Sequence, residues 1–356
     1  MEEMKTLITG LSRMQIEEFF REVAPLTQGE CNQMAEQIIG MHVLPSEVQG
    51  ATSYTVAPAG CATGSVVQFR TGDYALDLEF LEFVRQAYGG RFVPQHWHSG
   101  RLGKLHVYTM DNVGGVSAYL ARSQLRARDG YLLTTALQDF AGFFASAWHN
   151  TPPSMPVPNR HELYNDYKSQ LQQLRRGLPE RFHKLLDRLI ENLPGLFASD
   201  WPMVPNHTDL LENNIHVDPK TGSITGICDW KDAEIGPFGT SIEGLESLLG
   251  ERTTTGWRWV PNQASLRQRF WQAFAAAMGP IPSNILQRVD DARLVGIFLK
   301  HGLEWVSTES RAPVREGSSA FGYLQAVTLD LEGSVESSCG CANGSRQACC
   351  IIGEDL

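Results

Sequence analysis

The sequence predicts an α+β protein in two parts, a small antiparallel sheet followed by a larger and mainly helical region. Segments with the β-branched and aromatic content of buried strands lie in the first third of the chain, as in Ser65–Arg70 and Leu105–Met110. Apolar residues at helical spacing follow, above all between Leu133 and Trp148. A chain of 356 residues is long enough for two lobes.

A helical extension, residues 1–43, is expected before the sheet. Ser12 and Thr27 each precede a Gln or Glu by three positions, which is the capping-box pattern that begins helices. Two short helices are therefore predicted to follow these residues and to serve as packing elements.

The sheet and one helix are predicted within residues 44–111. Val48–Val56 contains two β-prone runs around a turn that holds one glycine, a pattern that a plain hairpin also shows. Ser65–Arg70 is predicted to be a buried strand. Tyr74–Val84 has apolar residues at helical spacing with acids between them, which predicts an amphipathic helix.

The second part, residues 117–330, is indicated by an apolar stripe on one face of a long helix. Two prolines, Pro152 and Pro153, then stop this helix. Two further helices with polar faces are predicted within residues 161–198. The stripe consists of Leu133, Leu137, Phe140, Ala141, Phe144 and Trp148.

Three oxygen-bearing side chains in this part point to metal-assisted phosphoryl transfer. Asp209 and Asn214 lie five positions apart on one short loop, and Asp229 follows an apolar strand. Turn-forming residues at 218–223 separate two strand-like runs, so a hairpin is expected to bring Asp229 back beside Asn214. Phosphoryl transfer requires an acceptor for the hydroxyl proton and oxygen ligands that hold magnesium on the phosphates. An ordinary surface hairpin is the alternative interpretation.

These segments resemble the aminoglycoside phosphotransferase and choline kinase-like family. In that family His-Gly-Asp, four residues and Asn are followed by a hairpin and Asp-Trp. Here His207 to Asp209, Asn214 and Asp229 match, with threonine at the glycine position. The resemblance implies a protein-kinase-like bilobal fold with a five-stranded N-lobe and a helical C-lobe. It also implies that Asp209 is the catalytic base, that Asn214 and Asp229 hold Mg²⁺, and that His207 supports the loop.

The same resemblance implies how the N-lobe would bind ATP. Arg70 would clamp the phosphates at the strand end where protein kinases have a lysine. Glu79 would pair with Arg70, and Glu82 is the second choice. The alternatives are a surface-facing arginine and solvated glutamates. The turn that would cover the phosphates consists of Gly50, Ala51, Thr52 and Ser53.

Residues 112–116 resemble the hinge of the family. The backbone of Asp111, Asn112 and Val113 would face the adenine edge, and two glycines would let the chain turn into the C-lobe. An ordinary loop is the alternative. Further along, Ser241 stands where the family usually has an acid, which is expected to loosen the support of the catalytic loop. This variant resembles a fungal branch of the family.

Composition limits the partners and the location. A net charge of −10 argues against nucleic acid and anionic membrane, and it favours cationic or neutral substrates at the pocket rim. No apolar run reaches membrane-spanning length, and the first four residues are not a signal sequence. A soluble, cytoplasmic protein is expected.

The C-terminal segment, residues 331–356, is predicted to be a flexible tail rich in Cys, Gly and Ser. A zinc site or disulfides are the alternatives, although structural zinc sites favour wider pair spacings. The cysteines in question are Cys339, Cys341, Cys349 and Cys350.

The sequence therefore predicts an ATP- and Mg²⁺-dependent kinase of a small-molecule hydroxyl, that is, a phosphotransferase with an alcohol acceptor. The chain contains no Asp-Phe-Gly or Ala-Pro-Glu segment after Asp229, which favours small molecules over protein substrates. The principal alternative is a kinase-fold protein that binds a ligand or partner without phosphoryl transfer. The glycine-poor turn and the missing strand lysine motivate it, whereas intact Asp209, Asn214 and Asp229 count against it.

Overall fold

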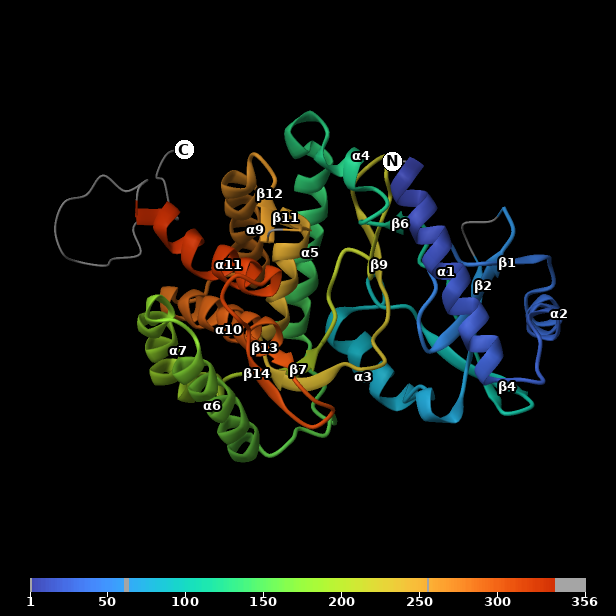
Figure 1. Cartoon of the computed structure of the whole chain (residues 1–356), viewed down its shortest axis with the longest axis horizontal. Coiled ribbons are helices and arrows are strands. Elements are labelled where there is room, and N and C mark those ends of the chain that lie inside the picture. Colours follow the sequence, from blue (N-terminus) through green and yellow to red (C-terminus); the bar gives the residue numbers. More distant parts are fainter. Residues whose placement is uncertain (1, 61–63, 255, 337–356) are drawn as a thin grey trace. The chain divides into compact units, whose positions relative to one another are not determined.

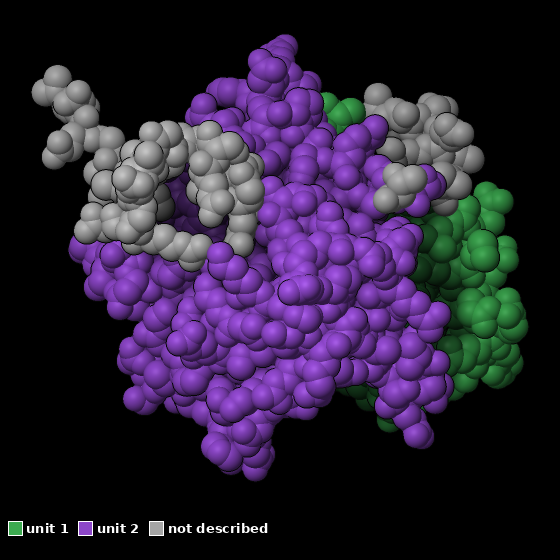
Figure 2. All heavy atoms as spheres, turned by 60° about the vertical axis from the view of Figure 1, so that its left-hand side comes forward, with its two compact units in different colours: residues 1–124, 213–231 green, residues 125–212, 232–356 purple. Residues whose placement is uncertain are grey.

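The computed structural model describes residues 2–60, 64–254 and 256–336. The chain forms two compact units, which Figure 2 distinguishes by colour. Unit 1 comprises residues 1–124 and 213–231, and unit 2 comprises residues 125–212 and 232–356. Unit 1 thus contains the segment predicted as the hinge together with residues 213–231, which the sequence assigned to the second part. The location of the hinge stays a prediction.

Unit 1 is built on a five-stranded antiparallel sheet with strand order β1-β2-β3-β5-β4. Alternate residues of a strand share a face, so Val67 and Phe69 of β3 are buried on the same side as Tyr54 and Val56 of β2. The strands are β1 (Val43–Pro45), β2 (Ser53–Pro58), β3 (Ser65–Arg70), β4 (His96–Leu102) and β5 (Leu105–Asp111).

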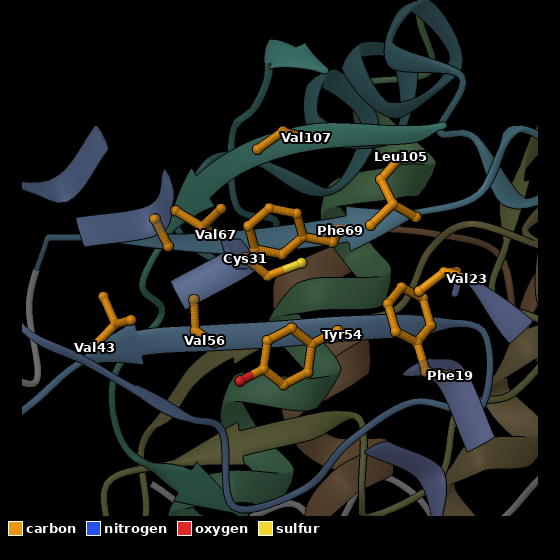
Figure 3. Close-up of a cluster of buried hydrophobic side chains, with 11 residues drawn as sticks. Phe19, Val23, Cys31, Val43, Tyr54, Val56, Val67, Phe69, Leu105 and Val107 are labelled. Atoms are coloured by element: carbon orange, nitrogen blue, oxygen red, sulfur yellow. The ribbon is translucent and has the colours of Figure 1, made fainter. Parts of the chain in front are cut away.

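Two N-terminal helices, α1 (Glu2–Glu22) and α2 (Gln28–Ile39), pack against that face of the sheet. Figure 3 shows Cys31 of α2 between the side chains of β2 and β3. The helices and the sheet thus share one hydrophobic core, whose largest contribution to stability is the burial of apolar surface. Its members are Phe19, Val23, Cys31, Ala35, Val43, Tyr54, Val56, Val67, Phe69, Leu105 and Val107.

The capping prediction is confirmed at Thr27 and wrong at Ser12. At the start of α2, the Glu30 N–H donates to Thr27 Oγ1 at 3.3 Å, and the Thr27 N–H donates to Glu30 Oε2 at 2.8 Å. Ser12 lies inside α1, which is one helix of 21 residues. Its hydroxyl instead donates to the Glu47 carbonyl at 2.9 Å and so ties α1 to the loop before β2.

Three other local predictions need correction. The first strand ends at Pro45, so Val48 lies in a loop. The amphipathic helix α3 (Leu78–Tyr88) begins later than expected, because Asp77 is its N-cap and accepts from the Phe80 N–H at 3.0 Å. Strand β4 was not foreseen, since its sequence, His-Trp-His-Ser-Gly-Arg-Leu, lacks β-branched residues. It forms an edge of the sheet, where polar side chains are common.

A second, three-stranded sheet in unit 1 joins segments that are far apart in the sequence. Its strand order is β6-β8-β9, and all pairs are antiparallel. The predicted hairpin is therefore present as β8 and β9. The short strand β6, which begins at the last residue of the predicted hinge, completes the sheet. The strands are β6 (Val116–Ser117), β8 (Ile215–Val217) and β9 (Ile224–Ile227).

Unit 2 is mainly helical and contains the predicted long helix α5 (Tyr131–His149), drawn in green in Figure 1. The apolar stripe faces inward, where Phe140 and Phe144 meet Phe270 of α9 (Gln263–Met278) at ring-centroid distances of 6.3 and 6.5 Å. The two helices expected within 161–198 are also present. The remaining long helices are α6 (Arg160–Gly177), α7 (His183–Leu196), α10 (Ser283–His301) and α11 (Ser319–Glu336).

Short elements connect these helices. Strands β7 (Met203–Asn206) and β10 (Glu234–Pro237) pair antiparallel and flank the predicted catalytic loop. The other short strands and helices are β11 (Gly250–Thr253), β12 (Gly256–Trp259), β13 (Leu303–Trp305), β14 (Arg311–Pro313), α4 (Arg122–Arg126), α8 (Leu245–Leu249), and the 3₁₀ turns η1 (Gly72–Tyr74), η2 (Arg128–Gly130), η3 (Glu180–Phe182) and η4 (Thr240–Gly244).

Within the described ranges, no helix combines the length and the apolar character needed to cross a membrane. Cys31 and Cys228 form no disulfide within the described residues, and burial raises the pKa of each thiol to about 12. Both thiols are therefore protonated at neutral pH. The cysteines of the predicted tail lie outside the described residues, although α11 extends to Glu336, inside the segment predicted as tail.

Candidate functional site

The hairpin of unit 1 holds Asn214 and Asp229 at its open end. Asn214 immediately precedes β8, and Asp229 follows β9 with Cys228 between them. The Cys228 N–H donates to the Asn214 carbonyl at 2.8 Å, so the two strand ends are joined where the candidate metal ligands begin. At the other end, the Asp218 N–H donates to the Ser223 carbonyl at 2.9 Å, which closes the turn. The turn chemistry read in the sequence thus fixes the register of the pair.

Asp229 has an unusual backbone conformation. Its φ is 63°, in the left-handed region that residues other than glycine adopt uncommonly, aspartate and asparagine more often than most. Such a conformation costs of order 1 kcal/mol and is concentrated at functional sites. The side chain is 56% exposed and points its Oδ1 toward Arg70, whose Nη2 lies 3.8 Å away. Asp229 therefore presents an accessible carboxylate beside a buried cation.

Arg70 lies at the end of β3, and it is almost fully buried. Its Nε donates to Gln68 Oε1 at 2.6 Å, and its Nη1 reaches Thr52 Oγ1 at 3.5 Å. The surface-facing alternative for Arg70 does not hold. Glu79 is exposed in the first turn of α3, and its pairing with Arg70 stays a prediction. The structure thus brings Arg70 to Asp229.

The glycine-poor turn is shaped by a glutamine. Gln49 is buried, its Nε2 donates to the carbonyls of Ser46 and Thr55, and its Oε1 accepts from the Thr55 N–H at 3.0 Å. One carboxamide therefore bridges the loop between β1 and β2, in place of the conformational freedom that several glycines would supply. Thr52, from the same turn, contacts Arg70. Sequence reasoning missed Gln49, because a polar residue in a loop gives no local sign that it is buried.

The segment predicted as the hinge is fastened to the hairpin. The Gly114 carbonyl accepts from Thr225 Oγ1 at 3.2 Å, and His216 Nδ1 lies 3.4 Å from the same oxygen. Gly115 has φ 64°, and a Cβ there would lie 2.4 Å from the Val217 carbonyl oxygen. Only glycine permits this approach. The predicted hinge segment is thus joined by hydrogen bonds and close packing to the hairpin that holds the candidate metal ligands within unit 1.

Two of the backbone amides predicted to face adenine are already used inside unit 1. The Asp111 N–H donates to the Gln95 carbonyl at 3.0 Å, and the Asn112 N–H donates to the Gly64 carbonyl at 2.8 Å. The Asn112 side chain also caps the turn, since its Oδ1 accepts from the Gly114 N–H at 3.0 Å. A nucleotide contact from this segment would therefore not use these two donors in the arrangement described.

Unit 2 holds Asp209 on the loop after β7. His207 is buried, and its Nδ1 accepts from the Asp209 N–H at 3.0 Å, which supports the predicted role of His207 in shaping the loop. Thr208, at the position where the family has glycine, donates from its hydroxyl to the Asp232 carbonyl at 3.0 Å. The threonine thus adds a tie between the loop and the chain after the hairpin. The Asp209 side chain is 60% exposed.

Ser241 supports the predicted catalytic loop in spite of the missing acid. Its hydroxyl donates to Asn206 Oδ1 at 2.7 Å, and its N–H lies 3.3 Å from the same atom. Asn206 Nδ2 in turn faces the carbonyls of Val204 and Pro237 at 3.2 and 3.3 Å. Neutral hydrogen bonds therefore hold the residue that precedes His207. The expected loosening of the loop is not what these contacts indicate.

The donor set fits a hard divalent cation. Asn214 and Asp229 offer an amide and a carboxylate oxygen, the ligands that magnesium prefers while it keeps several of its waters. In the described residues no cluster of three or more His, Cys, Asp or Glu side chains is arranged to hold a metal. A fully protein-ligated site of the zinc type is thus not found among those residues.

Comparison with solved structures supports the fold. The GDP complex of a variant of aminoglycoside 2'-phosphotransferase IIIa is 14% identical, with a TM-score of 0.51, over 87% of this chain and 96% of that chain. A choline/ethanolamine kinase family protein from Mesorhizobium loti is 13% identical, with a TM-score of 0.48, over 78% of this chain and 84% of that chain. At such identities the first likeness establishes the fold alone, and it confirms the predicted protein-kinase-like fold class.

A comparison with curated proteins found no match. The model of the phosphotransferase enzyme family matches residues 78–282, more than half of the chain. The matched range includes α3, the hinge segment, the catalytic loop and the hairpin, and therefore Asp209, Asn214 and Asp229. The chain belongs to the phosphotransferase enzyme family.

Proposed function

We propose that the protein is an ATP- and Mg²⁺-dependent kinase that phosphorylates a hydroxyl of a small molecule. Asp209 accepts the proton of the attacking hydroxyl, and Asn214 and Asp229 hold Mg²⁺. Magnesium, when bound, would neutralise charge on the phosphates. Arg70 clamps the phosphates, and the turn from Gly50 to Ser53 covers them. Family membership supports phosphotransfer as the class of reaction.

The observation that carries this proposal is the conformation of Asp229. The carboxylate of Asp229 is held at φ 63°, is 56% exposed and lies next to buried Arg70, so it is accessible to a ligand. Left-handed backbone at residues other than glycine is concentrated at functional sites, which supports the metal-ligand role proposed for Asp229.

The alternative, a kinase-fold protein that binds without transferring phosphate, remains the second candidate. The lone glycine of the turn motivated it, and Gln49 supplies an ordered turn without further glycines. Arg70 is a cation at the end of β3, so the missing lysine is replaced by another positive charge. Both observations favour the enzyme.

The substrate is proposed to be a cationic or neutral hydroxylated molecule, because the net charge of −10 repels anions at long range. Neighbouring structures carry the names of aminoglycoside, macrolide and choline/ethanolamine kinases, which suggests where a substrate search begins. We further propose that the protein belongs to a fungal branch of the family and resides in the cytoplasm.

Calorimetry of ATP binding, with and without Mg²⁺, tests the nucleotide site. We expect Mg²⁺-dependent binding to the intact protein and its loss in Asp229→Ala. Asp218→Asn is the matched control, because it changes an acid at the closed end of the same hairpin and keeps the acceptor for the Lys220 N–H. Binding that is absent from the intact protein would remove the ATP-kinase assignment. Binding without ADP formation, over a panel of aminoglycosides, choline and sugars, would favour the non-catalytic candidate.

A further inference from the structure

We infer that Lys300 is a positioning residue for Asp209, a role that rests on the proposed function. Lys300 lies in the last turn of α10, and its Nζ is 3.9 Å from Asp209 Oδ1. The catalytic loop from 207 to 214 contains no lysine or arginine of its own. The fold therefore supplies a positive charge to the proposed base from a helix that lies far along the chain.

Lys300 is itself held in place by a buried acid. Its Nζ donates to Glu243 Oε1 at 2.8 Å, and the Glu243 side chain is 4% exposed. His301, the next residue of α10, lies with its Nε2 3.0 Å from Glu243 Oε2. A buried carboxylate is costly unless its partners are in place. Glu243 therefore fixes the ammonium group, which has further N–H donors to direct toward Asp209.

The segment η4, which contains Glu243, and α10, which contains Lys300, meet backbone to backbone. A Cβ on Gly296 of α10 would lie 2.0 Å from the Thr240 carbonyl oxygen. A Cβ on Gly239, just before η4, would lie 2.8 Å from the Ala292 Cβ. Such close approach leaves no room for either segment to shift toward the other. The distance between Glu243 and Lys300 is thus set by the packing.

The 3₁₀ turn η4 supports the predicted catalytic loop at two points: at Asn206 directly, and at Asp209 through Lys300. Ser241 binds the side chain of Asn206, two residues before Thr208, and Glu243 binds Lys300, which faces Asp209. Asp209 is 60% exposed, so packing alone does not select one orientation of its carboxylate. A fixed ammonium selects the orientation electrostatically. Loss of Lys300 should accordingly slow the transfer step and leave nucleotide binding unchanged.

The decisive variant removes the charge without leaving a buried ion unpaired. Lys300→Met alone would deprive Glu243 of a partner and destabilise the fold. The double variant Lys300→Met/Glu243→Gln removes both charges. We expect it to melt close to the intact protein, to bind ATP with Mg²⁺ normally, and to show kcat at least tenfold lower, with KM for ATP unchanged within about twofold. Lys300→Arg, which keeps a cation at this place, should recover part of kcat.

Arg288→Met is the matched control. Arg288 lies on the same helix, is 22% exposed like Lys300, and pairs with Asp200 at 3.2 Å. It should lower the melting temperature and leave kcat unchanged. Transfer is followed with the acceptor from the substrate panel, or with water as acceptor of the ATP phosphate where the panel yields none.

The outcomes separate the two claims. If Asp209→Asn abolishes transfer and the double variant turns over like the intact protein, the inference on Lys300 is overturned and the kinase stands. A double variant as slow as predicted, with Lys300→Arg partly active, supports the inference. Failure of the intact protein to bind ATP with Mg²⁺, or to transfer its phosphate at all, removes the proposed function and the inference together.

Discussion

Two groups of charged residues in this protein differ in how tightly they are paired. Glu246 of α8 is fully buried, and Arg267 and Arg293 donate to its two oxygens at 2.5 to 2.8 Å. Each charge of this cluster has a partner at hydrogen-bond distance, as the low-dielectric interior requires. The cluster ties α8 to α9 and α10, and its geometry indicates a structural role.

The candidate site has looser ion pairs and more exposed acids. Asp229 lies 3.8 Å from Arg70, and Asp209 lies 3.9 Å from Lys300, while the two carboxylates are 56% and 60% exposed. Exposed carboxylates that face less exposed cations at this range stay accessible to a ligand. In the Glu246 cluster the charged groups contact one another at hydrogen-bond distance, whereas in the candidate site the paired carboxylates stay exposed to solvent.

The largest expected effect tests the open acids. Asp209→Asn keeps the size of the side chain and removes the proposed base, so kcat should fall by about 10³-fold. Because the carboxylate is exposed, the melting temperature should stay within about 2 °C. Steady-state kinetics and thermal unfolding measure the two quantities. A large loss of stability would mean that Asp209 has a structural role, which would contradict the difference between the candidate site and the Glu246 cluster.

The second prediction concerns the Glu246 cluster, where we expect a loss of stability without a loss of activity. Glu246→Gln leaves two guanidinium groups around a neutral buried partner, so the free energy of unfolding should drop by about 3 kcal/mol. The kcat of the folded fraction should not change. Urea unfolding, together with kinetics at a temperature where the variant is folded, gives both numbers. An unchanged unfolding midpoint would contradict the structural role of the cluster.

A third prediction uses pH and the surroundings of Arg70. Burial, with a smaller contribution from the Arg70 charge, lowers the pKa of His96 to about 4. The unfolded chain binds this proton more tightly, so the stability from neutral His96 is full above its ordinary pKa of 6.5 and is lost as the pH falls toward 4. We expect a loss of about 2 kcal/mol over this range, after allowance for partial exposure.

Urea unfolding of the intact protein and of His96→Gln, at about pH 7 and about pH 4.5, checks this. The variant should lose less stability on acidification than the intact protein. Equal losses in the two proteins would show that protonation of His96 does not contribute to the loss of stability at low pH.

The smallest expected effect separates charge from geometry at Arg70. Arg70→Lys keeps a cation but removes the forked donors that reach Gln68 and Thr52. The dissociation constant for ATP with Mg²⁺ should rise by about tenfold, which is a modest loss compared with that of Asp229→Ala. Calorimetry measures it directly. Unchanged affinity would mean that Arg70 acts at the site by charge alone.

Local patterns were reliable wherever the chain makes its own contacts. The turn residues at 218–223 predicted the β8–β9 hairpin, and the apolar stripe predicted α5. The capping box at Thr27 held because its partners lie three residues apart. The same pattern at Ser12 failed, since a hydroxyl inside a helix is free to bond to a distant loop.

The sequence by itself determined the fold class and the segment that holds Asp209, Asn214 and Asp229, because turn chemistry, periodicity and motif spacing are local properties. Only the tertiary structure decided which residues meet that segment from elsewhere. Lys300 beside Asp209, Arg70 beside Asp229 and Ser241 on Asn206 all join positions far apart in the chain. Such pairs depend on how the elements pack, and packing is set by the shapes and burial of many side chains together.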